Sequence, residues 1–181
     1  MAKKAHQDLT KLPSYDAKEK KLVNVIVETP RGSRNKFAYD PDLLIFRLKK
    51  VLPAGMEFPY DFGFVPSTKA PDGDPLDVLL LMDESAHPGT LMRCRLIGIF
   101  EGEQTEGGKK ERNDRVLAVS EHSMQYAHVK DIDDLDKKIL KSLQDFFVNY
   151  HELEKVKFKL LACKRSKDAY RAVEKTRRRS K

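Results

Sequence analysis

Long apolar segments are absent from this sequence of 181 residues. A membrane-spanning helix needs roughly 18 apolar residues in succession, and no run in the chain approaches that length. The stretch 1–21 is polar and lacks the apolar core of a secretion signal. We therefore expect a cytoplasmic protein that has no membrane among its partners.

Cysteine is scarce as well, because only Cys94 and Cys163 occur. Two residues provide neither a disulfide framework nor the paired spacing of a zinc site. Each lies inside an apolar segment, 92–99 or 156–163, where a free cysteine usually behaves as a small hydrophobic residue. We expect both side chains to be buried.

Charge, in contrast, is plentiful: charged residues make up 35% of the chain and hydrophobic residues 40%. Length and composition together predict one domain over residues 1–181. Much of the formal net charge of +7 comes from the two ends, an N-terminal extension at 1–21 and a basic tail at 175–181. Because terminal basic runs are usually solvated tails, we expect no nucleic-acid partner.

Short strand patterns dominate the first two thirds of the chain. Apolar and β-branched runs predict strands at 22–29, 36–39, 43–48, 77–82, 92–100, 115–119 and 156–163. Prolines, glycines and aromatics make 51–65 look irregular, and a polar loop is expected before 115. Apolar side chains spaced by three and four predict a helix at 134–153, and a second helix is expected at 167–177 with Ser166 as its N-cap.

This order of elements favours an α+β fold. Many short antiparallel strands precede a helical C-terminal third, without the strict strand-helix alternation of a parallel sheet. We expect a closed five-stranded OB-like β-barrel with external helices.

The most informative segment runs from Asp72 to Asp77 and reads Asp-Gly-Asp-Pro-Leu-Asp. Three carboxylates within six positions repel one another, and at a barrel mouth their pKa values would rise unless a cation neutralised them. Oxygen ligands of this kind favour Mg²⁺ or Mn²⁺. A solvated Asp-Gly turn is the plain alternative, but Gly73 lets the chain approach a ligand closely and Pro75 stiffens the path into the next strand.

The same run matches a D-x-D-P-x-D signature, so the sequence resembles the soluble inorganic pyrophosphatase family. The resemblance extends over about 22–163. It includes the segments 27–30, 58–64, 93–95, 128–131 and 146–154. It implies hydrolysis of inorganic pyrophosphate to two orthophosphates by a metal-activated water, with Mg²⁺ or possible Mn²⁺ as cofactor. It also implies a homo-oligomer, commonly a hexamer.

The resemblance assigns roles around the metal ions. Asp72 and Asp77 would bind the activating ions, and Asp74 would deprotonate the attacking water. Glu28 matches an acid that supports the ions bound with substrate. This division agrees with general chemistry, because a water held between two divalent ions loses a proton near neutral pH to a nearby carboxylate.

The resemblance also implies residues that hold phosphate, namely Lys36 and Tyr150. Taken alone, Lys36 is typical of a surface lysine, and Tyr150 is typical of a core aromatic with a solvated hydroxyl. Their order and spacing around the aspartate run favour the functional interpretation.

Several family positions are altered in this chain. The phosphate-binding arginine aligns with Lys50, one family lysine aligns with Arg115 and another with His151. Lys50 and Arg115 keep a positive charge for phosphate, whereas His151 would keep one only below its unperturbed pKa of roughly 6.5. A family acid and two family tyrosines are replaced by Ala38, Phe58 and Phe62.

Two family metal ligands fall in the altered loop before 115. One aspartate aligns with Asn113, whose amide oxygen is the weaker ligand. Asp114 is the alternative, although strand alternation would place it on the opposite face. The second aspartate matches Glu106, in a loop lengthened by 107–110. The altered positions leave two alternatives: a catalytically impaired relative that binds metal and phosphate, or an OB-type nucleic-acid-binding module.

Overall fold

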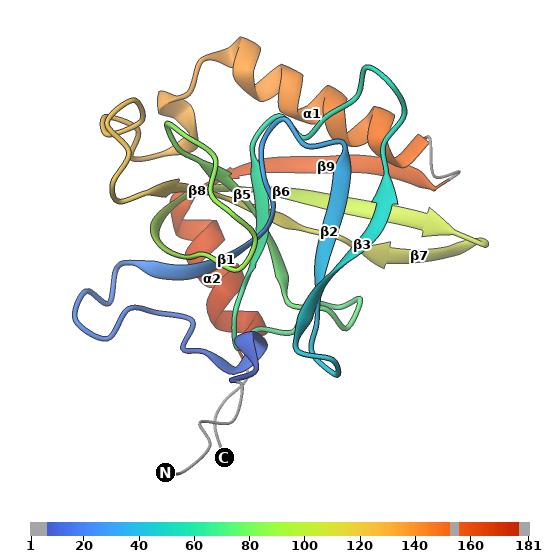
Figure 1. Ribbon diagram of the computed structural model, residues 1–181. Helices are drawn as coiled ribbons and strands as arrows, with labels where there is room; N and C mark the ends of the chain where they lie inside the picture. Colours follow the sequence, from blue (N-terminus) through green and yellow to red (C-terminus); the bar gives the residue numbers. More distant parts are fainter. Residues whose placement is uncertain (1–6, 153–155, 178–181) are drawn as a thin grey trace.

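The computed structural model of this chain describes residues 7–152 and 156–177. Strands dominate this part of the sequence, and two α-helices pack against them (Figure 1). The strands are β1 (Val23–Thr29), β2 (Asn35–Asp40), β3 (Ile45–Val51), β4 (Asp61–Val65), β5 (Leu76–Leu81), β6 (Leu91–Glu106), β7 (Lys109–Arg112), β8 (Arg115–Ser120) and β9 (Lys157–Arg165). The helices are α1 (Lys137–Glu152) and α2 (Ser166–Thr176), with short 3-10 helices at Leu9–Lys11 and Ile132–Asp134.

Five strands close a ring. β1 pairs with β4, β4 with β5, β5 with β8, β8 with β6, and β6 returns to β1. The mixed α+β class is therefore confirmed. The expectation of antiparallel pairing is wrong for β5 and β8, which run parallel, because β6 and β7 lie between them in the chain and reverse its direction twice. β2 and β3 form a separate two-stranded sheet, and β7 and β9 pair with β6.

Apolar side chains form two clusters on opposite faces of the ring strands. Along β5, Leu79 and Leu81 belong to the cluster that includes side chains of α1, and Val78 and Leu80 to the cluster that includes side chains of α2. A strand buried on both faces reads as a continuous apolar run. Each fully buried aliphatic side chain contributes roughly 1.5–3 kcal/mol relative to exposure, so β5 is a firm support for the acidic residue near its start, Asp77.

Both helix starts differ from the expected positions. α1 begins at Lys137 rather than at 134, because Asp131 and Asp134 form a capping box around the 3-10 helix and Leu135 is then extended. Ser166 is the first residue of α2, and its hydroxyl donates to Asp131 Oδ2 at 2.6 Å. The prediction that Ser166 is the N-cap is therefore wrong.

Two regions are more regular than the sequence indicates. The irregular stretch contains β4, in which Gly63 lies so close to β1 that an added Cβ would be 2.0 Å from the carbonyl oxygen of Ile26. The expected polar loop before 115 is largely a hairpin. β6 continues past 100 and turns through Gly107 and Gly108, both with positive φ, into β7.

The two cysteines differ in exposure. Cys94 is buried as predicted, but the prediction is wrong for Cys163, which is exposed on β9.

The guanidinium of Arg177 lies 5.8 Å from the ring centroid of Tyr15, so the start of the basic tail contacts the N-terminal extension. The rest of the tail, 178–181, lies outside the described residues. No helix among the described residues is long and apolar enough to cross a membrane.

Candidate active site

Two cavities share the lining residues Lys36, Asp74 and Asp77. The first, which we name the aspartate cavity, has a volume of about 560 Å³ and is lined by Lys36, Asp72, Asp74, Asp77, Gln104, Glu111, Asn113, Arg115, Tyr150, His151 and Val156. The second, of about 610 Å³, is lined in addition by Glu28 and Lys50. Every expected site residue with a described side chain lines one or both cavities. The side chain of Glu106 lies outside the described part of the structure.

Backbone contacts hold the three motif aspartates in the loop that enters β5. Gly73 has a φ of 95°, which residues with a side chain rarely adopt. The amide of Asp74 donates to Asp72 Oδ1 at 3.1 Å. Thr68 Oγ1 accepts a hydrogen bond of 2.8 Å from the backbone amide of Leu76, the residue before Asp77. The loop therefore presents all three carboxylates to the aspartate cavity.

The acids of the site lack sufficient positive charge. Burial raises the pKa of Asp77 to about 6, since Arg115 and Lys36 offset only part of the cost. Burial also raises the pKa of Glu28 to about 7, although its Oε1 accepts a 2.7 Å hydrogen bond from the amide of Tyr39. A cation beside these groups would favour their ionised forms.

The oxygen atoms that could ligate a metal in the aspartate cavity suit a hard divalent cation. They are carboxylate and amide oxygens, which Mg²⁺ and Mn²⁺ prefer. Among residues 7–152 and 156–177, no three His, Cys, Asp or Glu side chains converge closely enough to hold an ion by themselves. Mg²⁺ usually keeps several waters and binds one or two carboxylates plus substrate phosphate, so this spread of acids fits it.

Two lysines meet at an aromatic group. Lys36 and Lys50 are partners across β2 and β3, and their Nζ atoms lie 5.5 Å and 4.2 Å from the ring centroid of Tyr150. Burial lowers the pKa of Lys50. The rings of Phe58 and Phe62, which replace two family tyrosines, lie 5.9 Å apart beside this group. Phe62 lines the second cavity with an apolar ring, whereas Phe58 is buried and lines neither cavity.

Arg115 is the buried cation of the site, with 4% of its side chain exposed. Its guanidinium lies 4.5 Å from the ring centroid of Phe147, and Nη1 donates to the carbonyl oxygen of Asn113 at 3.2 Å. Nε is 3.7 Å from Asp77 Oδ2, too far for a hydrogen bond, and has no hydrogen-bond partner among the described residues. A buried donor without a partner costs about 1–3 kcal/mol, so this edge of the guanidinium would be stabilised by any acceptor that reached it.

His151 lies beside Arg115 and is neutral. Arg115 Nη2 is 3.1 Å from His151 Nε2, and because arginine can only donate, Nε2 is the acceptor. Burial, followed by repulsion from Arg115, Lys36 and Lys50, lowers the pKa of His151 to about 3. The expectation of a positive His151 below roughly pH 6.5 is therefore wrong. The imidazole orients the guanidinium and offers phosphate no charge.

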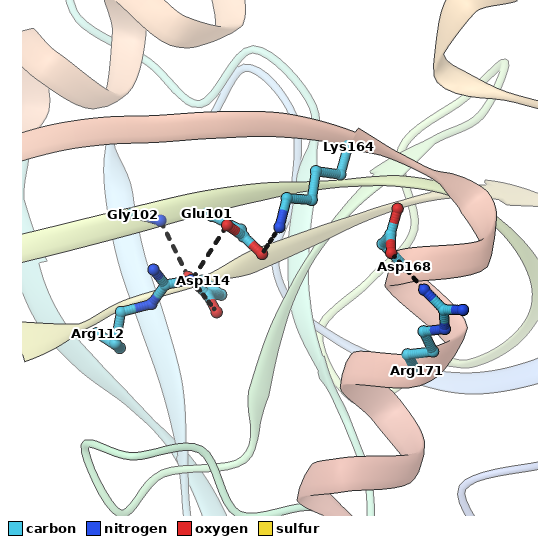
Figure 2. Close-up of polar contacts among 7 residues, drawn as sticks. All are labelled: Glu101, Gly102, Arg112, Asp114, Lys164, Asp168 and Arg171. Carbon is cyan, nitrogen blue, oxygen red and sulfur yellow. Dashed lines mark hydrogen bonds and ion pairs between the residues drawn. The ribbon is translucent and has the colours of Figure 1, made fainter.

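Asn113 lines the aspartate cavity, whereas Asp114 points away from it. The carboxylate of Asp114 accepts from Arg112 Nη2 and from the amide of Gly102, each at 3.0 Å (Figure 2). Asn113 Nδ2 donates to Gln104 Oε1 at 2.6 Å. Strand alternation is thus as expected, and Asn113 remains the predicted ligand of the two.

Two polar residues that line the aspartate cavity, Gln104 and Glu111, are not expected from the sequence. They are direct partners across the hairpin of β6 and β7. Gly107-Gly108 is a sequence signal for a two-residue hairpin turn. With that turn recognised, Glu111 and Asn113 fall on one face because they are two positions apart.

Known proteins show the same fold and much of the same sequence. A family model described as inorganic pyrophosphatase matches residues 25–181. An inorganic pyrophosphatase of Synechocystis sp. is 38% identical over 157 residues, which cover 87% of this chain and 89% of the relative. One of Thermus thermophilus is 37% identical over 170 residues, or 94% of each chain. The crystal structure of inorganic pyrophosphatase from Thermus thermophilus matches with a TM-score of 0.83 at 32% identity, covering 93% of this chain and 95% of that one. The chain therefore belongs to the inorganic pyrophosphatase family.

Proposed function

We propose that this chain hydrolyses inorganic pyrophosphate to two orthophosphates, with Mg²⁺ as its cofactor and Mn²⁺ as a substitute. One observation carries the proposal: the aspartate cavity sets three motif carboxylates against the cationic side chains of Lys36 and Arg115. A space lined by both signs of charge suits a polyanion that binds together with divalent cations, as phosphoryl transfer requires.

The residues that would hold the ions are the acids and the amide of the two cavities. We assign Asp72 and Asp77 as the principal ligands, Glu28 as a supporting acid, and Asn113 and Glu106 as ligands from the hairpin side. Divalent ions bound there would lower the pKa of a coordinated water and neutralise phosphate charge.

The remaining residues act on the water and the phosphates. Asp74 lines both cavities, and we assign it as the acceptor of the proton from the attacking water. We assign Lys36, Lys50 and Arg115 as the positive charges for the phosphate oxygens. The Nε of Arg115 is buried and has no hydrogen-bond partner among the described residues. Tyr150 would donate its hydroxyl to the terminal phosphoryl group.

We also propose a barrel type, a cellular location and an oligomeric state. The ring of five strands is read as an OB-like barrel, and the protein as a cytoplasmic homo-oligomer, a hexamer as the family resemblance implies. Apolar side chains that remain exposed on the single chain support association; they are Leu43, Ile45, Leu48 and Val51. Light scattering of the purified protein tests the subunit number.

Phosphate release by the purified protein tests the function. With pyrophosphate and Mg²⁺ or Mn²⁺ we expect rapid release that EDTA abolishes. Metal binding without phosphate release would support the catalytically impaired relative, for which Ala38, Phe62 and Asn113 are the motivating changes. Salt-sensitive oligonucleotide binding without release would support the nucleic-acid module.

A further inference from the structure

The hairpin of β6 and β7 brings three polar residues to one face. Gln104 pairs with Glu111 across the hairpin, and Glu103 pairs with Arg112. Because neighbouring strand residues point to opposite faces, Gln104, Glu111 and Asn113 all line the aspartate cavity. Glu103 and Arg112 do not line it.

Of these three residues only the glutamate carries charge. Asn113 stands where the family has a ligand carboxylate, and its amide is joined to the amide of Gln104 by a 2.6 Å hydrogen bond. Glu111 therefore brings the one carboxylate of this face of the hairpin, among described side chains, into the cavity.

Glu111 forms an ion pair with Lys109, and this ion pair is weak. Lys109 Nζ lies 2.5 Å from Glu111 Oε1, but 78% of the lysine side chain is exposed. Solvent-exposed ion pairs contribute little, commonly below about 1 kcal/mol. A divalent cation entering the cavity can therefore replace Lys109 at small cost.

The same cavity holds independent evidence for a charged ligand. Arg115 is almost wholly buried, and its Nε has no hydrogen-bond partner among the described residues. Asp72, on the loop side, lines the same cavity as Glu111. The carboxylates of loop and hairpin thus line one space together with the guanidinium of Arg115.

We propose that Glu111 supplies the cation-attracting carboxylate that Asn113 no longer provides, and that Lys109 is its partner while no divalent cation is bound. This rests on the proposed function, since it concerns the same metal-dependent site. It makes the hairpin of this chain a rebuilt half of the site, with the carboxylate moved from position 113 to position 111.

Mn²⁺ binding to the full chain without pyrophosphate tests the proposal, measured by calorimetry or by the magnetic resonance signal of free Mn²⁺. Glu111→Gln should weaken binding about three- to tenfold, because one carboxylate charge leaves the cavity. Glu103→Gln is the matched control: Glu103 lies in the same hairpin and is paired with Lys110 at 3.1 Å, but faces away. It should change affinity less than twofold. Equal affinities of the two variants would overturn the proposal.

Two further variants guard against a trivial loss of folding. Lys109→Met removes the competing ammonium and should tighten Mn²⁺ binding, and Asn113→Asp added to Glu111→Gln should restore it. Failure of both would also overturn the proposal. The proposed function is judged separately, by phosphate release from the unaltered protein. If that protein is active while Glu111→Gln binds Mn²⁺ as Glu103→Gln does, only this inference fails.

Discussion

The loop from Asp72 to Asp77 and the hairpin of β6 and β7 both contribute to the aspartate cavity, but they differ in how closely they keep the family pattern. The loop retains all three carboxylates. On the hairpin side, the family resemblance aligns Asn113 with a carboxylate and the neutral His151, which lies on α1, with a lysine. This side therefore presents an amide and a neutral imidazole to the cavity, and its one carboxylate among described side chains is that of Glu111.

The difference has a structural cause. The loop depends on the positive φ of Gly73 and leads into β5, a strand whose apolar residues are all buried. The hairpin projects from the ring, and its tip and the start of β7 are exposed. Substitution there disturbs little packing. The three motif carboxylates thus enter the aspartate cavity from a loop anchored by a buried strand, whereas Glu111 enters it from a more exposed hairpin.

The largest expected effect lies on the loop side. Asp77→Asn should lower the rate of phosphate release at least 100-fold, about 3 kcal/mol of transition-state stabilisation, because it removes a carboxylate that we propose as a principal metal ligand. Asp114→Asn is the matched control, an acid next to the hairpin that points away from the cavity. We expect it to keep activity within about threefold. Similar losses in the two variants would erase the distinction between loop and hairpin.

The second prediction tests whether the residues at positions 151 and 115 depend on each other. His151→Lys restores the family residue but places a second buried cation next to Arg115, whose Nη2 now has a neutral acceptor at 3.1 Å. We expect the free energy of unfolding to fall by about 2–4 kcal/mol, measured by urea denaturation. His151→Gln, which keeps an acceptor, should cost less than half as much. An unchanged stability of His151→Lys would show that the two positions are independent.

The third prediction concerns the pH dependence of stability. The pKa values of two carboxyl groups on ring strands are raised, those of Glu28 on β1 and Asp77 on β5. Both groups bind protons more tightly in the folded than in the unfolded chain. Without metal, they therefore destabilise the fold as pH rises from about 4 to about 7, by on the order of 1–3 kcal/mol. Glu28→Gln should flatten this slope in denaturation series with EDTA. Saturating Mg²⁺ should also flatten it, because the cation stabilises the ionised forms. An identical slope for Glu28→Gln would contradict the assignment.

The smallest expected effect concerns the amide of the hairpin side. Asn113→Asp adds a carboxylate to the cavity and should lower the half-saturating Mg²⁺ concentration several-fold, on the order of 1 kcal/mol. Asp114→Ala should leave the Mg²⁺ requirement nearly unchanged, because its carboxylate is engaged with Arg112 and Gly102. A large rise in the requirement for Asp114→Ala would identify Asp114 as the ligand instead.

Local sequence patterns predicted the loop side well. The Asp72 to Asp77 run and the apolar runs of β1, β5 and β8 depend on neighbours in the chain, so their elements are placed within one or two residues. The site residues expected from the family motif also meet at the two cavities. Their roles as ligands and proton acceptor remain predictions.

The hairpin side was less predictable, because its properties depend on contacts that are distant in sequence. The position of Glu111 follows from its pairing with Gln104 across a turn. The low pKa of His151, which lies on α1, follows from burial and from Arg115, which lies on β8. β4 was hidden for a different reason: its glycine is needed for close approach to β1 and breaks the apolar pattern.

The parallel pairing of β5 and β8 also affects how the site assembles. Asp77 and Arg115 are register partners in this pair, yet all of β6 and β7 lies between them in the chain. Such a long-range pairing carries a large loop-closure cost and forms late in folding. A divalent cation that binds only the completed pair therefore stabilises the native state without assisting the early steps. Its presence should slow unfolding more than it speeds refolding, and should slow hydrogen exchange at the amides that join the two strands.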